Sequence, residues 1–163
     1  MTQITEDTQA ENETENTAPD ARIELMRLYV KDVSMQIPAG AKAFQLEWQP
    51  ELNFEINTQA KALAEPHHYE VALRLKCTNT CKDQVAFTVE IIQAGLFKIE
   101  NLQGQPLQHA MATFCPNLLY PFVREAVGDM VVRAGFPQLN LAAVNFEALY
   151  QQTLAEQQGS TIQ

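Results

Sequence analysis

The 163-residue sequence lacks every short motif that would hold a nucleotide or activate a nucleophile. It has only six glycines, none of them clustered. It contains no phosphate-binding loop and no GxSxG, HExxH or CxxC motif. We therefore expect no enzymatic activity and no cofactor. Whatever the chain does to a partner is expected to be passive binding driven by mass action.

Long apolar runs and a secretory N-terminus are also missing. No stretch approaches the roughly 18 consecutive apolar residues that a membrane helix needs. The N-terminus has neither the basic start nor the apolar centre of a signal peptide. Three cysteines, Cys77, Cys81 and Cys115, cannot all pair with one another. Together these observations favour a cytoplasmic protein with free thiols and no direct membrane insertion.

Basic residues are scarce, because 20 acidic residues face 11 basic ones and the formal net charge is −9. That balance argues against direct binding to nucleic acid or to an anionic membrane surface. Six of the acids lie in residues 1–20, which leaves 14 acids against 11 bases in the remainder. We predict a disordered acidic tail over 1–21, a single domain over 22–156 and a flexible tail over 157–163.

Four segments have the composition and alternation of β-strands. They cover residues 22–37, 51–58, 68–78 and 84–93. The first carries apolar residues on both faces, so we expect it to be buried on both. The short polar segment 78–83 predicts a hairpin between the third and fourth strands. The segment 38–50 is bracketed by prolines and predicts a long crossover loop after the first strand.

The C-terminal half has helical periodicity. We predict a short helix over 107–115 and a second that begins near Asn117, with Pro121 in its first turn and Gly135 at its end. Asn145 is the expected N-cap of a last helix. The predicted fold class is therefore α+β: a four-stranded antiparallel sheet with a long crossover after its first strand, and helices in the C-terminal half.

Two polar groupings are candidates for chemical sites. Cys77 and Cys81 lie near His67 and His68, but their spacing fits no zinc pattern, and a strand cysteine beside a turn cysteine is the simpler interpretation. His109 on the short helix is expected to be a surface or hydrogen-bonded core histidine; the alternative is a general base. We predict no metal site and no catalytic residue.

Five strings, in this order and spacing, resemble the SecB family of protein-export chaperones. They are RLYVKDVSMQIP at 27–38, FQLEWQPE at 44–51, AGLF at 94–97, CPNLLYPFVRE at 115–125 and AGFPQLNLAAVNFEAL at 134–149. The resemblance runs from about Arg27 to Leu154, with Ala143 where the family usually has proline. It implies a homotetramer, a dimer of dimers, that binds unfolded precursor proteins and delivers them to the SecA motor.

The resemblance also implies a long apolar groove that binds unfolded chain. Its expected residues come from the crossover loop, the second strand and the last helix. They are Phe44, Trp48, Leu52, Phe54, Ile56, Phe146, Leu149, Tyr150 and Leu154. Such a groove recognises what a folded protein hides, so it selects unfolded clients without reading their sequence. The alternative is that some strand residues and the helical stripe are plain core.

Two further surfaces are implied. For SecA binding, Asp32 and Glu90 match acidic positions of the family. Two neighbouring positions depart from the family pattern: Gln36 replaces an acidic residue and Thr88 replaces an apolar one. The alternative is that Asp32 and Glu90 are ordinary solvated charges. The helix from Asn117 is apolar on more than one side, which suggests a subunit interface, although burial within one subunit would produce the same pattern. The expected interface residues are Leu119, Val123, Val127 and Met130.

The expected function is that of an ATP-independent chaperone that keeps precursors competent for translocation. A SecB-like chaperone with another client, such as one linked to an antitoxin, is the second possibility. The third is a small-molecule-binding or enzymatic α+β domain whose apolar groove holds a ligand.

Overall fold

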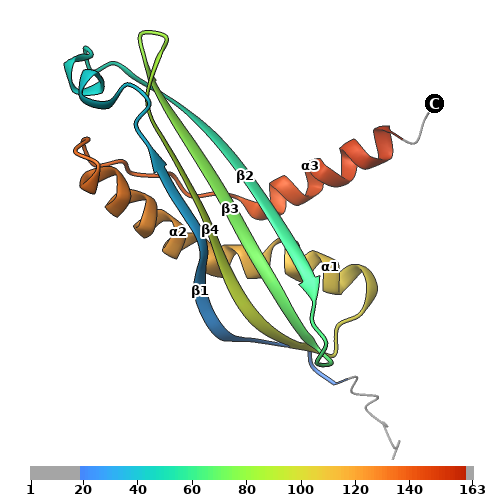
Figure 1. The fold of residues 1–163 in the computed structure, drawn as a ribbon. Helices are drawn as coiled ribbons and strands as arrows, with labels where there is room; N and C mark the ends of the chain where they lie inside the picture. Colours follow the sequence, from blue (N-terminus) through green and yellow to red (C-terminus); the bar gives the residue numbers. More distant parts are fainter. Residues whose placement is uncertain (1–18, 161–163) are drawn as a thin grey trace, which may run out of the picture.

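The structure, a computed structural model, describes residues 19–160 and contains one four-stranded sheet with three α-helices (Figure 1). The elements are β1 (Arg22–Gln36), the 3-10 helix η1 (Gly40–Gln45), β2 (Pro50–Ala62), β3 (His68–Cys81), β4 (Gln84–Glu100), α1 (Gly104–Ala112), α2 (Phe114–Arg133) and α3 (Phe146–Gly159). Most of the predicted acidic tail lies outside the described residues. No helix between residues 19 and 160 is long and apolar enough to cross a membrane.

The sheet has the strand order β1-β4-β3-β2, and every neighbouring pair is antiparallel. The chain therefore crosses from one edge of the sheet to the other between β1 and β2, which confirms the predicted crossover. Helices α1 and α2 lie across one face of the sheet (Figure 1). We call this the covered face, and the opposite side, over which no described helix packs, the open face.

The hairpin between β3 and β4 turns more tightly than predicted. Only Lys82 and Asp83 separate the strands, and both have positive φ, of 47° and 65°. This is the conformation that a two-residue hairpin loop with the twist of the strands requires. Cys81, which we expected in the turn, is instead the buried last residue of β3.

The prediction that β1 is buried on both faces is wrong, because none of its residues is buried and most are exposed. Two register shifts against β4, between Leu25 and Arg27 and between Val30 and Asp32, insert one extra residue each. Each bulge reverses the alternation of side chains. As a result most apolar residues of β1 share the covered face, where Val30 and Val33 remain half exposed beside α2.

The core lies between the covered face and α2. Alternate residues of β3 and β4 are buried there. From α2, Leu119, Val123 and Val127 pack against them and are 0% exposed within a single subunit. These three were predicted at a subunit interface, and that prediction is wrong, because a side chain sealed inside its own subunit has no surface to offer another. Met130, the fourth predicted residue, is only partly buried.

Helix boundaries also differ from the prediction. α2 begins at Phe114, so Asn117 is not its N-cap and Pro121 lies inside the helix, where it has no N–H to donate. The cap of α3 is confirmed: Asn145 Oδ1 accepts a hydrogen bond from the backbone N–H of Ala148 at 3.0 Å. α3 runs to Gly159, so residues 157–159 are helical and not a separate tail.

Candidate functional site

Four aromatic rings form a stack at one end of the sheet, where η1, the loop to β2 and the end of α2 meet (Figure 1). Phe136 is its centre. The ring of Phe44 stacks on it at 4.9 Å, Trp48 lies at 5.8 Å, and Phe87 of β4 packs on it at 4.8 Å. Phe87 and Phe136 are buried, whereas Phe44 is 54% and Trp48 40% exposed. The stack therefore has a fixed, buried base and an exposed top.

The end of α2 fixes this base. The backbone N–H of Phe136 donates to the Val131 carbonyl at 3.2 Å, and that of Gly135 to the Val132 carbonyl at 3.0 Å. This is the Schellman arrangement, in which a residue of positive φ closes the helix. Gly135 has a φ of +94°, and a Cβ there would lie 3.0 Å from Cε1 of Phe44. The absence of a side chain at 135 lets the Phe44 ring pack directly against the helix end.

The first half of β2 continues the apolar surface. Leu52, Phe54 and Ile56 are paired with Asn79, Cys77 and Leu75 of β3, so they point to the covered face. Leu52 is 39% and Phe54 43% exposed, whereas Ile56 is partly buried against the core. We call Phe44, Trp48, Leu52 and Phe54 the aromatic surface. All four were predicted groove residues, and the structure places them on one side of one end of the fold.

The helical part of the predicted groove lies elsewhere. Phe146 is buried, with its ring 5.9 Å from that of Tyr120 in α2, so its predicted place in the groove is corrected to the core. Tyr150 and Leu154 are partly buried and line a cleft against α1. Leu149 is 39% exposed. The predicted groove therefore divides into the aromatic surface and a separate contact between α3 and α1.

His109 has a structural role in that contact. Its Nε2 lies 2.6 Å from Glu147 Oε2, and its ring meets the Tyr150 ring edge-on at 5.2 Å. Hydrogen bonds from Gln151 and then His109 lower the pKa of the Glu147 carboxyl. Both members of the pair are about half exposed. His109 thus joins α1 to the start of α3, in agreement with the interpretation of a hydrogen-bonded surface histidine.

Sequence reasoning missed Phe87 and Phe136, which form the base of the stack. Phe87 lies in the predicted strand over 84–93, but nothing in that strand's alternation distinguishes it from its neighbours. Phe136 lies between a helix-ending glycine and a proline, in a segment whose position relative to the loop at 44–48 no local pattern reveals. The glycine itself was the available signal, because a positive-φ helix end fixes the direction of the residue that follows it.

The open face carries the two predicted acidic positions. Glu90 pairs with Ser34 across β1 and β4, and Asp32 pairs with Ile92, so both acids point outward on the open face as diagonal neighbours. Gln36 and Thr88 are the two departures from the family pattern. They pair directly with each other, two residues beyond the Ser34–Glu90 pair. Asp32 is exposed, and within residues 19–160 it makes no ion pair.

Glu90 is not free. It accepts hydrogen bonds from Arg74 Nε at 2.9 Å and Nη2 at 3.1 Å. These bonds lower the pKa of its carboxyl. Arg74 Nη1 also lies 3.8 Å from Glu55 on β2. The predicted acidic position is therefore occupied by a cation from the chain itself.

The three cysteines are buried and unpaired. Burial raises the pKa of the Cys77 thiol to about 11 and that of Cys115 to about 12. Across the described part of the chain, no three His, Cys, Asp or Glu side chains gather in a way that could hold a metal ion.

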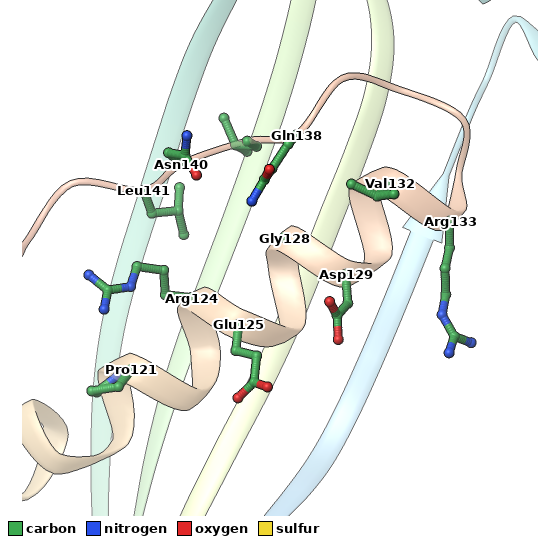
Figure 2. Close-up of a pocket in the computed structure, with 11 residues that line it drawn as sticks. Pro121, Arg124, Glu125, Gly128, Asp129, Val132, Arg133, Gln138, Asn140 and Leu141 are labelled. Carbon is green, nitrogen blue, oxygen red and sulfur yellow. The ribbon is translucent and has the colours of Figure 1, made fainter.

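The outer side of α2 presents apolar residues to solvent. They are Phe114, Leu118, Phe122 and Val132. We call them the outer stripe. A cleft between α2 and the connection to α3 runs beside it, and Figure 2 shows Arg124, Glu125, Asp129 and Arg133 around that cleft. Its lining thus combines charges of both signs with Val132.

The chain is similar to a known protein family and to solved structures. The family described as preprotein translocase subunit SecB matches residues 14–157. The protein-export protein SecB of Azotobacter vinelandii (strain DJ / ATCC BAA-1303) is 41% identical over 150 residues, which are 92% of each chain. Among solved structures, the Mycobacterium tuberculosis Rv1957 SecB-like chaperone, in complex with a ChAD peptide from the Rv1956 HigA1 antitoxin, has a TM-score of 0.60. It is 20% identical over 76% of this chain and 91% of that one, a likeness that concerns the fold.

Proposed function

Because the chain belongs to the SecB family of protein-export chaperones, we propose that it binds unfolded precursor proteins in the cytoplasm without ATP and delivers them to SecA. No bond is made or broken in this scheme. The observation that carries the proposal is the aromatic surface: two large rings stand 54% and 40% exposed on a base that is itself buried. Soluble domains rarely leave a large contiguous apolar patch open to water unless a partner covers it.

The physics of this surface suits unfolded clients. An extended chain that covers a few hundred Å² of apolar surface gains about 10 kcal/mol gross at roughly 25 cal/mol per Å². Ordering the flexible client offsets much of that gain, so each site is expected to bind modestly. Several sites on one oligomer then raise the overall affinity, because the second contact of a bound client is intramolecular.

We place the main client contacts on the aromatic surface. Ile56 supports it from the core side. We propose a second client-binding area on α3, formed by Leu149, Tyr150 and Leu154. One extended client can contact both areas only if it runs from the aromatic surface to α3. The exposed face of Leu149 and the cleft under Tyr150 support this assignment. Phe146 is left out, because it is buried.

The proposed assembly is a homotetramer, a dimer of dimers, held partly by the outer stripe of α2. A helix that is apolar on both its inner and its outer side is suited to lie between two layers. The cleft beside it carries Arg124 and Arg133 together with Glu125 and Asp129. Charges of both signs on one patch suit a contact between two copies related by a two-fold axis. Met130 keeps its proposed place at this interface.

The direct test is the refolding of a reduced, chemically unfolded precursor protein, followed with and without equimolar tetramer and without nucleotide. We expect refolding to slow in the presence of the chain, because bound segments cannot fold. A folded control protein should be unaffected. Unchanged refolding kinetics at equimolar tetramer would contradict the chaperone proposal.

Delivery to SecA needs its own test, since a SecB-like fold also serves other clients. We propose that Asp32 and Glu90 contact SecA. Glu90→Lys is expected to weaken SecA binding while the protein still retards precursor refolding, because Glu90 lies on the open face and the aromatic surface on the other. Equal loss of both activities would indicate misfolding, and intact SecA binding would remove Glu90 from the contact.

A further inference from the structure

Arg74 holds both oxygens of the Glu90 carboxylate. It reaches diagonally from β3 to β4 and donates through Nε and Nη2 at 2.9 and 3.1 Å, a two-pronged geometry that fixes the carboxylate in orientation as well as position. The side chains are 36% and 25% exposed, so solvent reaches the pair only in part. Both oxygens of the Glu90 carboxylate therefore already accept hydrogen bonds from Arg74. A cationic group of a partner must displace Arg74 or share the carboxylate with it.

The surrounding charges nearly cancel. On the open face, Glu90 pairs with Lys76 in the β3–β4 register, and Lys76 pairs with Glu55 in the β2–β3 register. Together with Arg74 and the diagonal Asp32, this patch holds three acids and two bases, a net charge of −1. Within residues 19–160 Lys76 makes no hydrogen bond to Glu90. Arg74 and Lys76 thus carry the same charge on the same face but differ in how they contact Glu90.

We propose that Arg74 is a positioning residue that limits how strongly the open face attracts a cationic segment of SecA, by occupying Glu90 until that segment displaces it. This inference rests on the proposed delivery to SecA. Removing the guanidinium would make the patch net −2 and free the carboxylate for the partner. The expected gain is electrostatic, so it should be large at low salt and small at high salt.

The experiment compares Arg74→Gln with Lys76→Gln, which removes the same charge without removing a hydrogen bond to Glu90. Binding of purified SecA and of a hexa-arginine peptide is measured by calorimetry at low and high salt. We expect Arg74→Gln to raise affinity about threefold to tenfold at low ionic strength and hardly at all at high ionic strength. Lys76→Gln should give a smaller gain, because it leaves the pair in place.

A double-mutant cycle adds the specific test. If Arg74 acts through Glu90, the gain from Arg74→Gln falls, in a Glu90→Gln background, to the smaller gain that Lys76→Gln gives through net charge alone. Arg74→Lys keeps the charge but loses the two-pronged geometry, so its affinity should lie between those of the original chain and Arg74→Gln. An unfolded Arg74→Gln protein would be recognised by its circular dichroism, and Arg74→Lys would then carry the comparison.

The outcomes separate this inference from the function on which it rests. If SecA fails to bind the original chain but Arg74→Gln strengthens hexa-arginine binding through Glu90, the role of Arg74 stands and delivery to SecA fails. Equal gains in affinity from Arg74→Gln and Lys76→Gln would show that only the net charge of the patch matters. That result would overturn the proposed role of Arg74. Unchanged or weaker binding of both probes to Arg74→Gln would overturn it outright.

Discussion

Strands β2 and β3 lie side by side and have the same alternating sequence pattern, yet their apolar residues have opposite fates. Leu75 of β3 is 1% exposed, whereas Leu52 of β2 is 39% exposed on the same side of the sheet. The difference is position. β3 lies in the middle of the sheet under α2, whereas β2 is an edge strand with the crossover loop at its start. An apolar face becomes a core only where a second layer covers it.

The comparison teaches that the same pattern supports stability in one strand and binding in the next. β3 keeps its apolar side chains from water permanently. β2 and the crossover loop leave theirs uncovered, which a stable monomer tolerates only when the patch is small or a partner shields it. The following predictions test that division, beginning with the largest expected effect.

The strongest test is a matched pair of leucine truncations. Leu75→Ala should lower the free energy of unfolding by about 3 kcal/mol, because it opens a cavity in a sealed core. Leu52→Ala should lower it by less than about 1 kcal/mol, since water already reaches that side chain. Urea denaturation at one fixed protein concentration measures both. Similar losses in the two variants would erase the distinction between the strands.

Thiol chemistry gives a second measure of how well β3 is sealed. Burial raises the folded pKa of Cys77 to about 11 from an ordinary 9.0, so it favours the neutral thiol. That contribution to stability is complete below pH 9 and is lost as the pH rises through 11. At pH 8.5 we expect Cys77 to react with a thiol reagent about a hundredfold more slowly in the folded protein than in urea.

Peptide mass analysis of the labelled protein identifies which cysteine reacted. Cys115, whose pKa burial raises to about 12, should be protected as well and provides an internal control. Labelling of Cys77 in the folded protein at the rate found in urea would show that β3 opens to solvent, contrary to the structure.

For the aromatic surface, Trp48→Ala should weaken binding of an unfolded client about tenfold and leave the oligomer intact, because a large exposed ring is lost from a preformed base. Fluorescence anisotropy of a labelled client measures the affinity. Trp48→Phe should restore most of it, since a smaller ring can still lie on Phe136. Trp48 is the single tryptophan, so its emission should also shift to shorter wavelength as a client covers it. Unchanged affinity in Trp48→Ala would remove this residue from the site.

The smallest expected effect belongs to β2. Leu52→Ala should lower client affinity about threefold, since only part of a leucine side chain is available to a client there. Asn53→Ala is the matched control: Asn53 pairs with Thr78 and points to the open face, so client affinity should not change. If Leu52→Ala binds clients as tightly as Asn53→Ala does, Leu52 does not contact clients, and the client-binding surface ends at the crossover loop.

Much of the fold was accessible from the sequence, because alternation, turn residues and caps act locally. The four strands, the hairpin, the crossover and the Asn145 cap were all predicted and observed. The bulges of β1 were not, because Met26 and Lys31 look like ordinary strand residues until the register with β4 is known. The start of α2 was missed because Asn117 is a good cap residue that local pattern could not distinguish from an interior one.

The candidate site was only partly predictable, for a physical reason. Leu118 and Leu119 are adjacent and identical, but one is exposed and the other fully buried. A helix that is apolar on several sides has no phase that shows which side meets the sheet. Phe146 was placed in the groove by the family resemblance, and the apolar stripe of its helix could not show that it faces the core. The family resemblance supplied the crossover loop and β2, but the covering layer, which separates core from surface, is visible only in three dimensions.

Gly135 affects the shape of the aromatic surface although it is not part of it. A substitution there would force a side chain into a left-handed backbone and push against the Phe44 ring. A substitution at Gly135 is therefore expected to change which clients bind, although no client contacts this residue. In a laboratory selection for altered substrates, variants at this helix end should accordingly be recovered alongside those in the loop itself.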